Sequence, residues 1–183
     1  MVVLAVGGVA VGVAVALAVH PIRSASDAGP STPAPVTSTV ASAAGPDTVG
    51  LTGTGDIHFG ATAEDLAMAH GLRADPAACM PRFTQPAYVQ PILVDGKLAM
   101  LTVEPPAHTP EGIGAGAAVA SVRTAYPGAE QLRPSQPYAY SGLLVSRGET
   151  GYLFLYSDDT VRKVLVGYVT YLRQLFAAAF PTC

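Results

Sequence analysis

Charged side chains are scarce in this 183-residue chain. They make up 13% of it, and the formal net charge at pH 7 is −3. General nucleic-acid binding requires a basic face, so this composition argues against a nucleic-acid partner. With so few charges, the surface must instead be rich in Ser, Thr, Gly, Ala and backbone groups.

Cysteine is also scarce, because only Cys79 and Cys183 are present. Two thiolates cannot close a zinc shell by themselves, and none of the four histidines is spaced as a partner ligand. The sequence therefore predicts no metal site. If the chain is exported, we expect these two cysteines to form one intramolecular disulfide that closes a loop of about one hundred residues. Free buried thiols and an intermolecular bridge are the alternatives.

Catalytic signatures are missing as well. The chain contains no Gly-x-Ser-x-Gly elbow, phosphate loop, His-Glu-x-x-His or Ser-x-x-Lys motif. The glycine-rich segment 112–116 precedes a helical pattern, but no lysine accompanies it, so we interpret it as a tight turn rather than an anion site. We interpret Asp158 and Asp159 as solvated turn formers and His58 as a surface histidine. The sequence thus predicts no catalytic residue and no cofactor.

The chain does contain a long run, residues 1–19, without any charged or polar side chain. As a helix this run would span roughly 28 Å, close to the hydrocarbon thickness of a bilayer. It predicts a signal peptide or a membrane anchor, and the absence of a basic leader favours the anchor. Residues 20–50 are rich in Pro, Ser, Thr and Ala, which predicts a disordered linker. We therefore expect residues 51–183 to form one domain outside the cytoplasm, secreted or anchored to the cell membrane.

The remaining chain carries a short internal similarity at an offset of 56 residues. At this offset Ile57 aligns with Ile113 and Gly60 aligns with Gly116, each before a helical pattern. Such self-similarity indicates a repeated structural unit. We therefore predict an α+β domain built from two tandem repeats, at about 54–104 and about 109–166.

Each repeat reads as one short helix followed by about three antiparallel strands, which predicts one layered sheet with helices on one face. Thr62 is a candidate N-cap with Asp65 at the capping-box position, and Gly71 is a candidate helix end. Asp95 and Gly96 suit a tight hairpin turn. A second helix is expected over 117–126. The expected strands are Cys79–Phe83, Tyr88–Leu93, Lys97–Glu104, Tyr138–Ser146, Thr150–Tyr156 and Val161–Val166.

The last part of the chain changes to helical periodicity. Apolar side chains recur at helical spacing over residues 168–180, which predicts a C-terminal helix. We expect its aromatic side to pack on the sheet. A membrane-surface helix is the alternative, but the polar side carries only Arg173 as a cation.

The start of each half, Ile57 through Leu66 and Ile113 through Val122, resembles the SmpA/OmlA-type module. Two such modules in tandem resemble the architecture of the beta-lactamase inhibitor protein family, and the resemblance covers roughly residues 54–166. It implies a non-enzymatic protein that acts by protein–protein contact, often in the bacterial envelope. The chain departs from that family by lacking Trp and by having one cysteine pair where the inhibitor has two. No inhibitory contact residue can be carried over.

These patterns together favour an exported, non-enzymatic binding or envelope-associated protein. It would contact the membrane through residues 1–19 if they are not cleaved, and it would have a protein partner. Two alternatives stay open, namely a hydrolase of envelope material with an unrecognised site, and a purely structural surface protein. An exposed apolar patch would favour binding, whereas a deep pocket with convergent polar groups would favour an enzyme or a small ligand.

Overall fold

The computed structural model describes residues 45–74, 80–136 and 139–178. The chain divides into two compact units, Met1–Thr39 and Val40–Cys183, and every described residue belongs to the second. The predicted apolar segment 1–19, residues 20–44 of the predicted linker, and both cysteines lie outside the described residues. Within the described ranges, no helix combines the length and the apolar character needed to cross a membrane.

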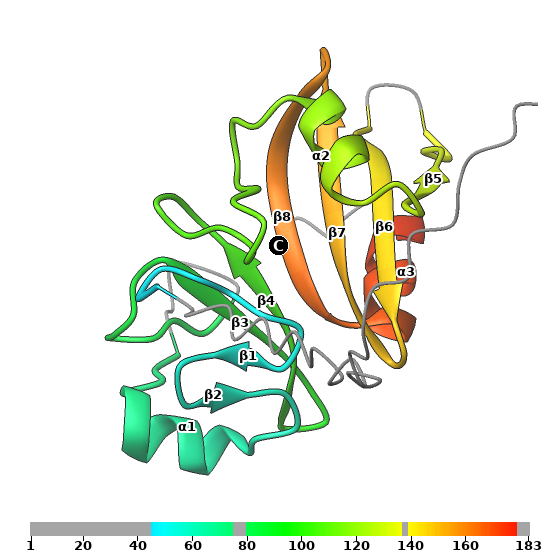
Figure 1. The fold of residues 1–183 in the computed structure, drawn as a ribbon. Coiled ribbons are helices and arrows are strands. Elements are labelled where there is room, and N and C mark those ends of the chain that lie inside the picture. Colours follow the sequence, from blue (N-terminus) through cyan, green and yellow to red (C-terminus); the bar gives the residue numbers. More distant parts are fainter. Residues whose placement is uncertain (1–44, 75–79, 137–138, 179–183) are drawn as a thin grey trace, which may run out of the picture. The chain divides into compact units, whose positions relative to one another are not determined.

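A six-stranded antiparallel sheet forms the centre of the described fold (Figure 1). Its strands lie in the order β3-β4-β8-β7-β6-β5, so the early hairpin β3–β4 joins the late strands through the pairing of β4 with β8. A separate small sheet pairs β1 with β2. The predicted α+β class is therefore confirmed. The strands are β1 Gly53–Thr54, β2 Ile57–His58, β3 Val89–Val94, β4 Lys97–Val103, β5 Glu130–Leu132, β6 Ser141–Arg147, β7 Thr150–Ser157 and β8 Thr160–Tyr168.

Helices cover both faces of this sheet. They are α1 Ala63–His70, α2 Val119–Ala125 and α3 Val169–Ala177. Leu66 of α1 and Val122 of α2 belong to one buried cluster, whereas Leu172 of α3 belongs to another. Figure 1 shows α2 in front of the sheet and α3 behind it. The helices of the two predicted repeats, α1 and α2, thus pack into one cluster, and the C-terminal helix α3 packs on the opposite face of the sheet.

The central strands explain why both faces need a cover. Along β7, Tyr152 and Phe154 face the first cluster, while Leu153 and Leu155 face the second. Successive side chains of a strand point to opposite faces, so an apolar run of this kind places hydrophobic surface on both sides. Packing α3 against β7 and β8 removes the second surface from water. Leu172, which is fully buried, is its anchor.

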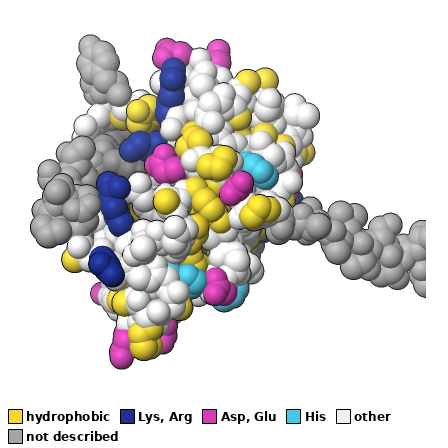
Figure 2. Space-filling model, turned by 90° about the vertical axis from the view of Figure 1, so that its left-hand side faces the viewer, with side chains coloured by type: hydrophobic (Ala, Val, Ile, Leu, Met, Phe, Trp, Pro, Cys, Tyr) yellow, Lys and Arg dark blue, Asp and Glu magenta, His cyan; other side chains and the backbone are white. Residues whose placement is uncertain are grey.

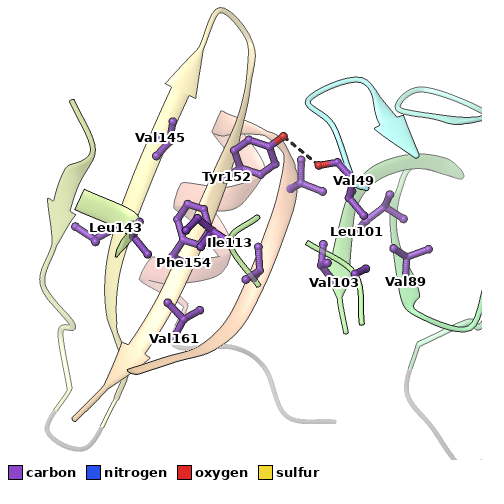
Figure 3. Packing of buried hydrophobic residues seen from close by; sticks show 14 of the residues in the cluster. Val49, Val89, Leu101, Val103, Ile113, Leu143, Val145, Tyr152, Phe154 and Val161 are labelled. Atoms are coloured by element: carbon purple, nitrogen blue, oxygen red, sulfur yellow. Dashed lines mark hydrogen bonds between the residues drawn. The ribbon is translucent and has the colours of Figure 1, made fainter. Parts of the chain in front are cut away.

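The larger cluster also includes a segment that the sequence assigns to the linker. Figure 3 shows Tyr152 pointing from β7 toward Val49, and its hydroxyl donates a hydrogen bond to the Val49 carbonyl at 3.1 Å. The Val49 N–H donates to the His108 carbonyl at 2.9 Å, and the Val49 side chain is 1% exposed. The prediction of a linker up to residue 50 is therefore wrong at its end, because Val49 belongs to the core of the domain.

The predicted local signals around α1 and the first hairpin are confirmed. The Asp65 N–H donates to Thr62 Oγ1 at 3.1 Å, which caps the start of α1. Gly71 ends the helix in the left-handed conformation at φ 61°. Asp95 and Gly96 join β3 to β4 with φ values of 49° and 73°, as a tight hairpin turn requires.

Two predictions about strands are wrong. In the described part of Cys79–Phe83 there is no strand of the main sheet, and Arg82 instead makes an isolated bridge with Arg73. The short strand β5 was not expected, because its sequence Glu-Gln-Leu lacks apolar alternation. Consequently the two halves contribute two and four strands to the main sheet rather than about three each.

The chain nevertheless starts α1 and α2 in the same way. Gly60 and Gly116 precede them with φ values of 88° and 90°, which favour glycine. The Gly60 N–H donates to the Leu98 carbonyl at 2.8 Å, and the Gly116 N–H donates to the Val161 carbonyl at 2.8 Å. In the next residues, the carbonyls of Ala61 and Ala117 accept from Leu98 and Val161, each at 2.9 Å.

The hairpins that receive these hydrogen bonds also match. β7 and β8 are joined by Asp158 and Asp159, whose φ values of 49° and 56° parallel those of the first hairpin. Each hairpin has one register shift, between Ile92 and Leu93 in β3 and between Leu155 and Tyr156 in β7. In both hairpins the spacing of these features is the same. The register shift follows Ile92 or Leu155, the turn begins three residues later at Asp95 or Asp158, and the acceptor carbonyl lies a further three residues on, at Leu98 or Val161.

Candidate functional site

An open cleft of about 490 Å³ lies at the C-terminal end of α1. Four segments surround it: the start of the described chain, the β1–β2 turn, the last turn of α1 and the loop before β3. The side chains that bear on its chemistry are Asp56, His70, Gln85, Pro86 and Tyr88. These residues come from distant parts of the sequence, so the fold assembles the cleft.

Two hydrogen bonds fix one wall of this cleft. The Tyr88 hydroxyl donates to the Pro46 carbonyl at 2.6 Å, which joins the start of the described chain to the residue before β3. Thr54 Oγ1 donates to the Thr48 carbonyl at 3.1 Å, and both threonines are buried. This wall is therefore held by tertiary contacts within the chain.

A histidine and a carboxylate lie next to each other in the cleft. His70 is the last residue of α1, its ring packs edge-on against Phe83 at 6.0 Å, and its side chain is 11% exposed. Its Nε2 lies 3.6 Å from Asp56 Oδ1, which is longer than a hydrogen bond. The Asp56 side chain is 85% exposed, so its carboxylate is accessible to a ligand.

The residue that aligns with His70 in the internal similarity, Tyr126, has a buried environment. Tyr126 follows α2 as the residue aligned with His70, and its hydroxyl donates to the Glu111 carboxylate and lies 2.8 Å from Thr109 Oγ1. Its ring packs against those of Tyr152 and Phe154 at 5.9 and 5.6 Å. Burial, the hydrogen bond to Glu111 and its charge raise the pKa of Tyr126 above its ordinary value. Tyr126 therefore has a buried hydroxyl that donates to a carboxylate, whereas the carboxylate beside His70 is exposed to solvent.

A second concave surface, of about 550 Å³, lies beside β5 and α3. Arg133, Arg173 and Phe176 line it. The Arg173 guanidinium binds Glu130 through two hydrogen bonds, and this contact lowers the pKa of the Glu130 carboxyl. A carboxylate of the chain thus neutralises Arg173, one of the two arginines that line this surface.

The sites weighed from the sequence have structural roles here. Gly112 and Gly116 occupy turn positions with φ values of 78° and 90°, and Asp158 and Asp159 form the β7–β8 turn. His58 is an exposed residue of β2. In the three described ranges, no group of three or more His, Cys, Asp or Glu side chains is arranged to hold a metal ion.

Sequence reasoning missed the pair formed by Asp56 and His70. The two residues are separated by β2 and the whole of α1, so no short motif contains both. A weak signal was present, because His70 aligns with Tyr126 in the internal similarity and both follow the same helical pattern. Comparisons with protein-family models, with curated proteins and with solved structures find no match to this chain.

Proposed function

We propose that residues 45–178 form a non-enzymatic binding domain that works outside the cytoplasm. Residues 1–19 would export it or anchor it to the cell membrane, and the following residues would hold it away from the membrane. The observation that carries the binding function is the open cleft beside α1, at a position that the second half of the same fold fills with Tyr126. If the two halves are repeats, Tyr126 fills the site that the first half leaves open beside α1. We interpret the open site as a surface that binds a ligand.

We further propose that the two halves are tandem modules of the SmpA/OmlA type, arranged as in the beta-lactamase inhibitor protein family. Support comes from the paired hydrogen bonds of Gly60 and Gly116, from the matched turns and from the matched register shifts. The unequal strand numbers and the added helix α3 are departures from a simple duplication. Proteins of that family act through protein–protein contact, which favours a protein partner for this chain.

The environment of the described tyrosines supports binding over catalysis. The two tyrosines with strongly raised pKa values, Tyr126 and Tyr152, lie in the core, and both hydroxyls have protein partners. They stabilise the fold and do not line the cleft. The cleft itself is open, since the Asp56 carboxylate is largely in contact with solvent. An open site of this kind suits a protruding group of a partner better than a reaction that must exclude water.

The location is tested by fusing a reporter enzyme, active only outside the cytoplasm, to the C-terminal end of the full chain. We expect an active reporter, and activity only after cell lysis would refute the location. Binding is tested in the native host with a photo-crosslinking amino acid placed at Gln85, which lines the cleft. The control position is Thr124, which is exposed on α2. We expect one discrete adduct from Gln85 and none from Thr124. If Gln85 gives no adduct, the proposed binding function fails.

A further inference from the structure

The electrostatic character of the cleft favours a positively charged ligand. Asp56 contributes a carboxylate that is 85% exposed, and no Lys or Arg is among the described residues that line the cleft. The C-terminal end of α1 also opens onto it through Ala69 and His70, and a helix C-terminus carries partial negative charge. On the face drawn in Figure 2, acidic and histidine side chains lie together at the lower edge, while Lys and Arg gather on the left-hand side.

The shape and the walls of the cleft suit a charged group on an aliphatic stem. Its volume of about 490 Å³ lies within the range of roughly 300–1,000 Å³ typical of small-molecule sites. Pro86 and Tyr88 supply apolar wall, and Gln85 supplies a neutral polar group. A stem of methylene groups can lie along such a wall while its charged end stays with the carboxylate.

The counterpart in the second half indicates what the ligand replaces. There the Glu111 carboxylate receives a hydrogen bond from the Tyr126 hydroxyl, so the chain itself supplies the donor. Among the described residues of the first half, Asp56 Oδ1 has only the His70 ring nearby, at 3.6 Å. Its carboxylate therefore has room for a donor from outside, and an ammonium group offers three donors and a full charge.

We propose that this cleft binds the ammonium group of a lysine side chain presented by the protein partner, with Asp56 as the counter-ion. The assignment rests on the proposed binding function and names the chemistry of its partner. Amines that carry a phosphate, such as a lipid headgroup, fit less well, because the described lining offers no cation to pair with the phosphate. A lysine side chain has both features that the cleft favours: an ammonium group that can pair with Asp56, and a methylene stem that can lie along the apolar wall.

The test is a nuclear magnetic resonance titration of the ¹⁵N-labelled full chain with Nα-acetyl-lysine methylamide. We expect saturable shifts at the amides of the β1–β2 turn and the last turn of α1. Asp56→Asn should weaken binding about two- to fivefold, since it removes the exposed charge that faces the ammonium. His70→Tyr should weaken it similarly, because a tyrosine there would fill the cleft as Tyr126 fills its counterpart. Asp159→Asn removes the same charge from an exposed turn and should leave binding unchanged.

Three results would overturn the assignment: no saturable shift, equal binding of the Nε-acetylated probe, or undiminished binding by Asp56→Asn. Tighter binding of phosphoethanolamine than of the lysine probe would also overturn it and would point to a headgroup. Asp56 is exposed, so Asp56→Asn should fold, and circular dichroism checks this. If the probe fails while crosslinking at Gln85 still yields a discrete adduct, the lysine assignment falls and the binding function stands. A crosslinking failure overturns the binding function, whatever the probe does.

Discussion

Alkaline pH should destabilise this domain through two buried tyrosines, Tyr126 and Tyr152. Burial raises the pKa of both phenols above the ordinary value of about 10, and the nearby Glu111 carboxylate raises both further. In the unfolded chain the same phenols ionise near pH ~10, whereas in the folded chain they remain neutral. Above that pH the unfolded chain therefore binds fewer protons than the folded one, and the free energy of unfolding falls as the pH rises.

The size of the effect follows from this difference in bound protons. Each tyrosine that is ionised only in the unfolded chain lowers the free energy of unfolding by about 1.4 kcal/mol per pH unit. Tyr126 and Tyr152 together should give a slope of about 1.4 kcal/mol per unit at pH ~10, where each phenol is half ionised in the unfolded chain, rising to about 2.5 at pH ~11. The total stability of a small domain is roughly 5–15 kcal/mol, so one to two pH units should remove a large share of it.

Urea unfolding of the full chain, followed by far-ultraviolet circular dichroism between about pH 8 and pH 11, measures this slope. Tyr126→Phe and Tyr152→Phe should each halve it. Each variant also loses a hydrogen bond at neutral pH, which costs about 1–3 kcal/mol when a buried group is left unpaired, so slopes are compared rather than absolute stabilities. Tyr140→Phe is the matched control, because Tyr140 is 38% exposed. A free energy that stays flat across this range, or a double variant with an unchanged slope, would refute the reasoning.

The remaining predictions test the repeat, the domain boundary and the disulfide. Gly60→Ala and Gly116→Ala should each cost about 1–2 kcal/mol in urea unfolding, because alanine is strained at positive φ; a cost at only one glycine would contradict the matched geometry. Deleting residues 45–50 should lower the thermal midpoint by several degrees, since it removes the buried Val49 and the partner of a tyrosine hydroxyl. A midpoint equal to that of a chain starting at residue 45 would show that the segment does not stabilise the core. Mass spectrometry of non-reduced peptides should show Cys79 linked to Cys183 in protein recovered from outside the cell, and two free thiols would contradict the prediction.

The start of α1, its end and the first turn could be predicted because they depend on neighbours in the sequence. The Thr62 cap reaches a residue three positions away, and Gly71 and Gly96 adopt backbone angles that glycine allows at low cost. The internal alignment of Gly60 with Gly116 pointed in the same way to a shared backbone geometry, and both glycines have nearly the same φ. Cap and turn residues of this kind can be predicted from the sequence because their geometry depends on residues close to them in the chain.

The boundary of the domain could not be predicted from composition. Residues 45–50 have the small and polar residues of the preceding linker. Val49 is nevertheless buried in the core, and its backbone bonds the Tyr152 hydroxyl of β7 and the His108 carbonyl. The sequence also could not predict which face of the sheet α3 covers. Both faces of the sheet are hydrophobic, so the apolar side of α3 could pack on either one. Both outcomes depend on contacts between residues far apart in the chain.

By itself, the sequence determined the α+β class, most strands of the main sheet, the helix starts and the tight turns, because periodicity and turn chemistry act over a few residues. Only the tertiary structure decided that Asp56 and His70 come together in an open cleft, while Tyr126 is buried and donates to Glu111. The physical reason is that a cleft exists where segments fail to fill the space between them. That depends on how four distant segments pack, and no short stretch of sequence contains the information.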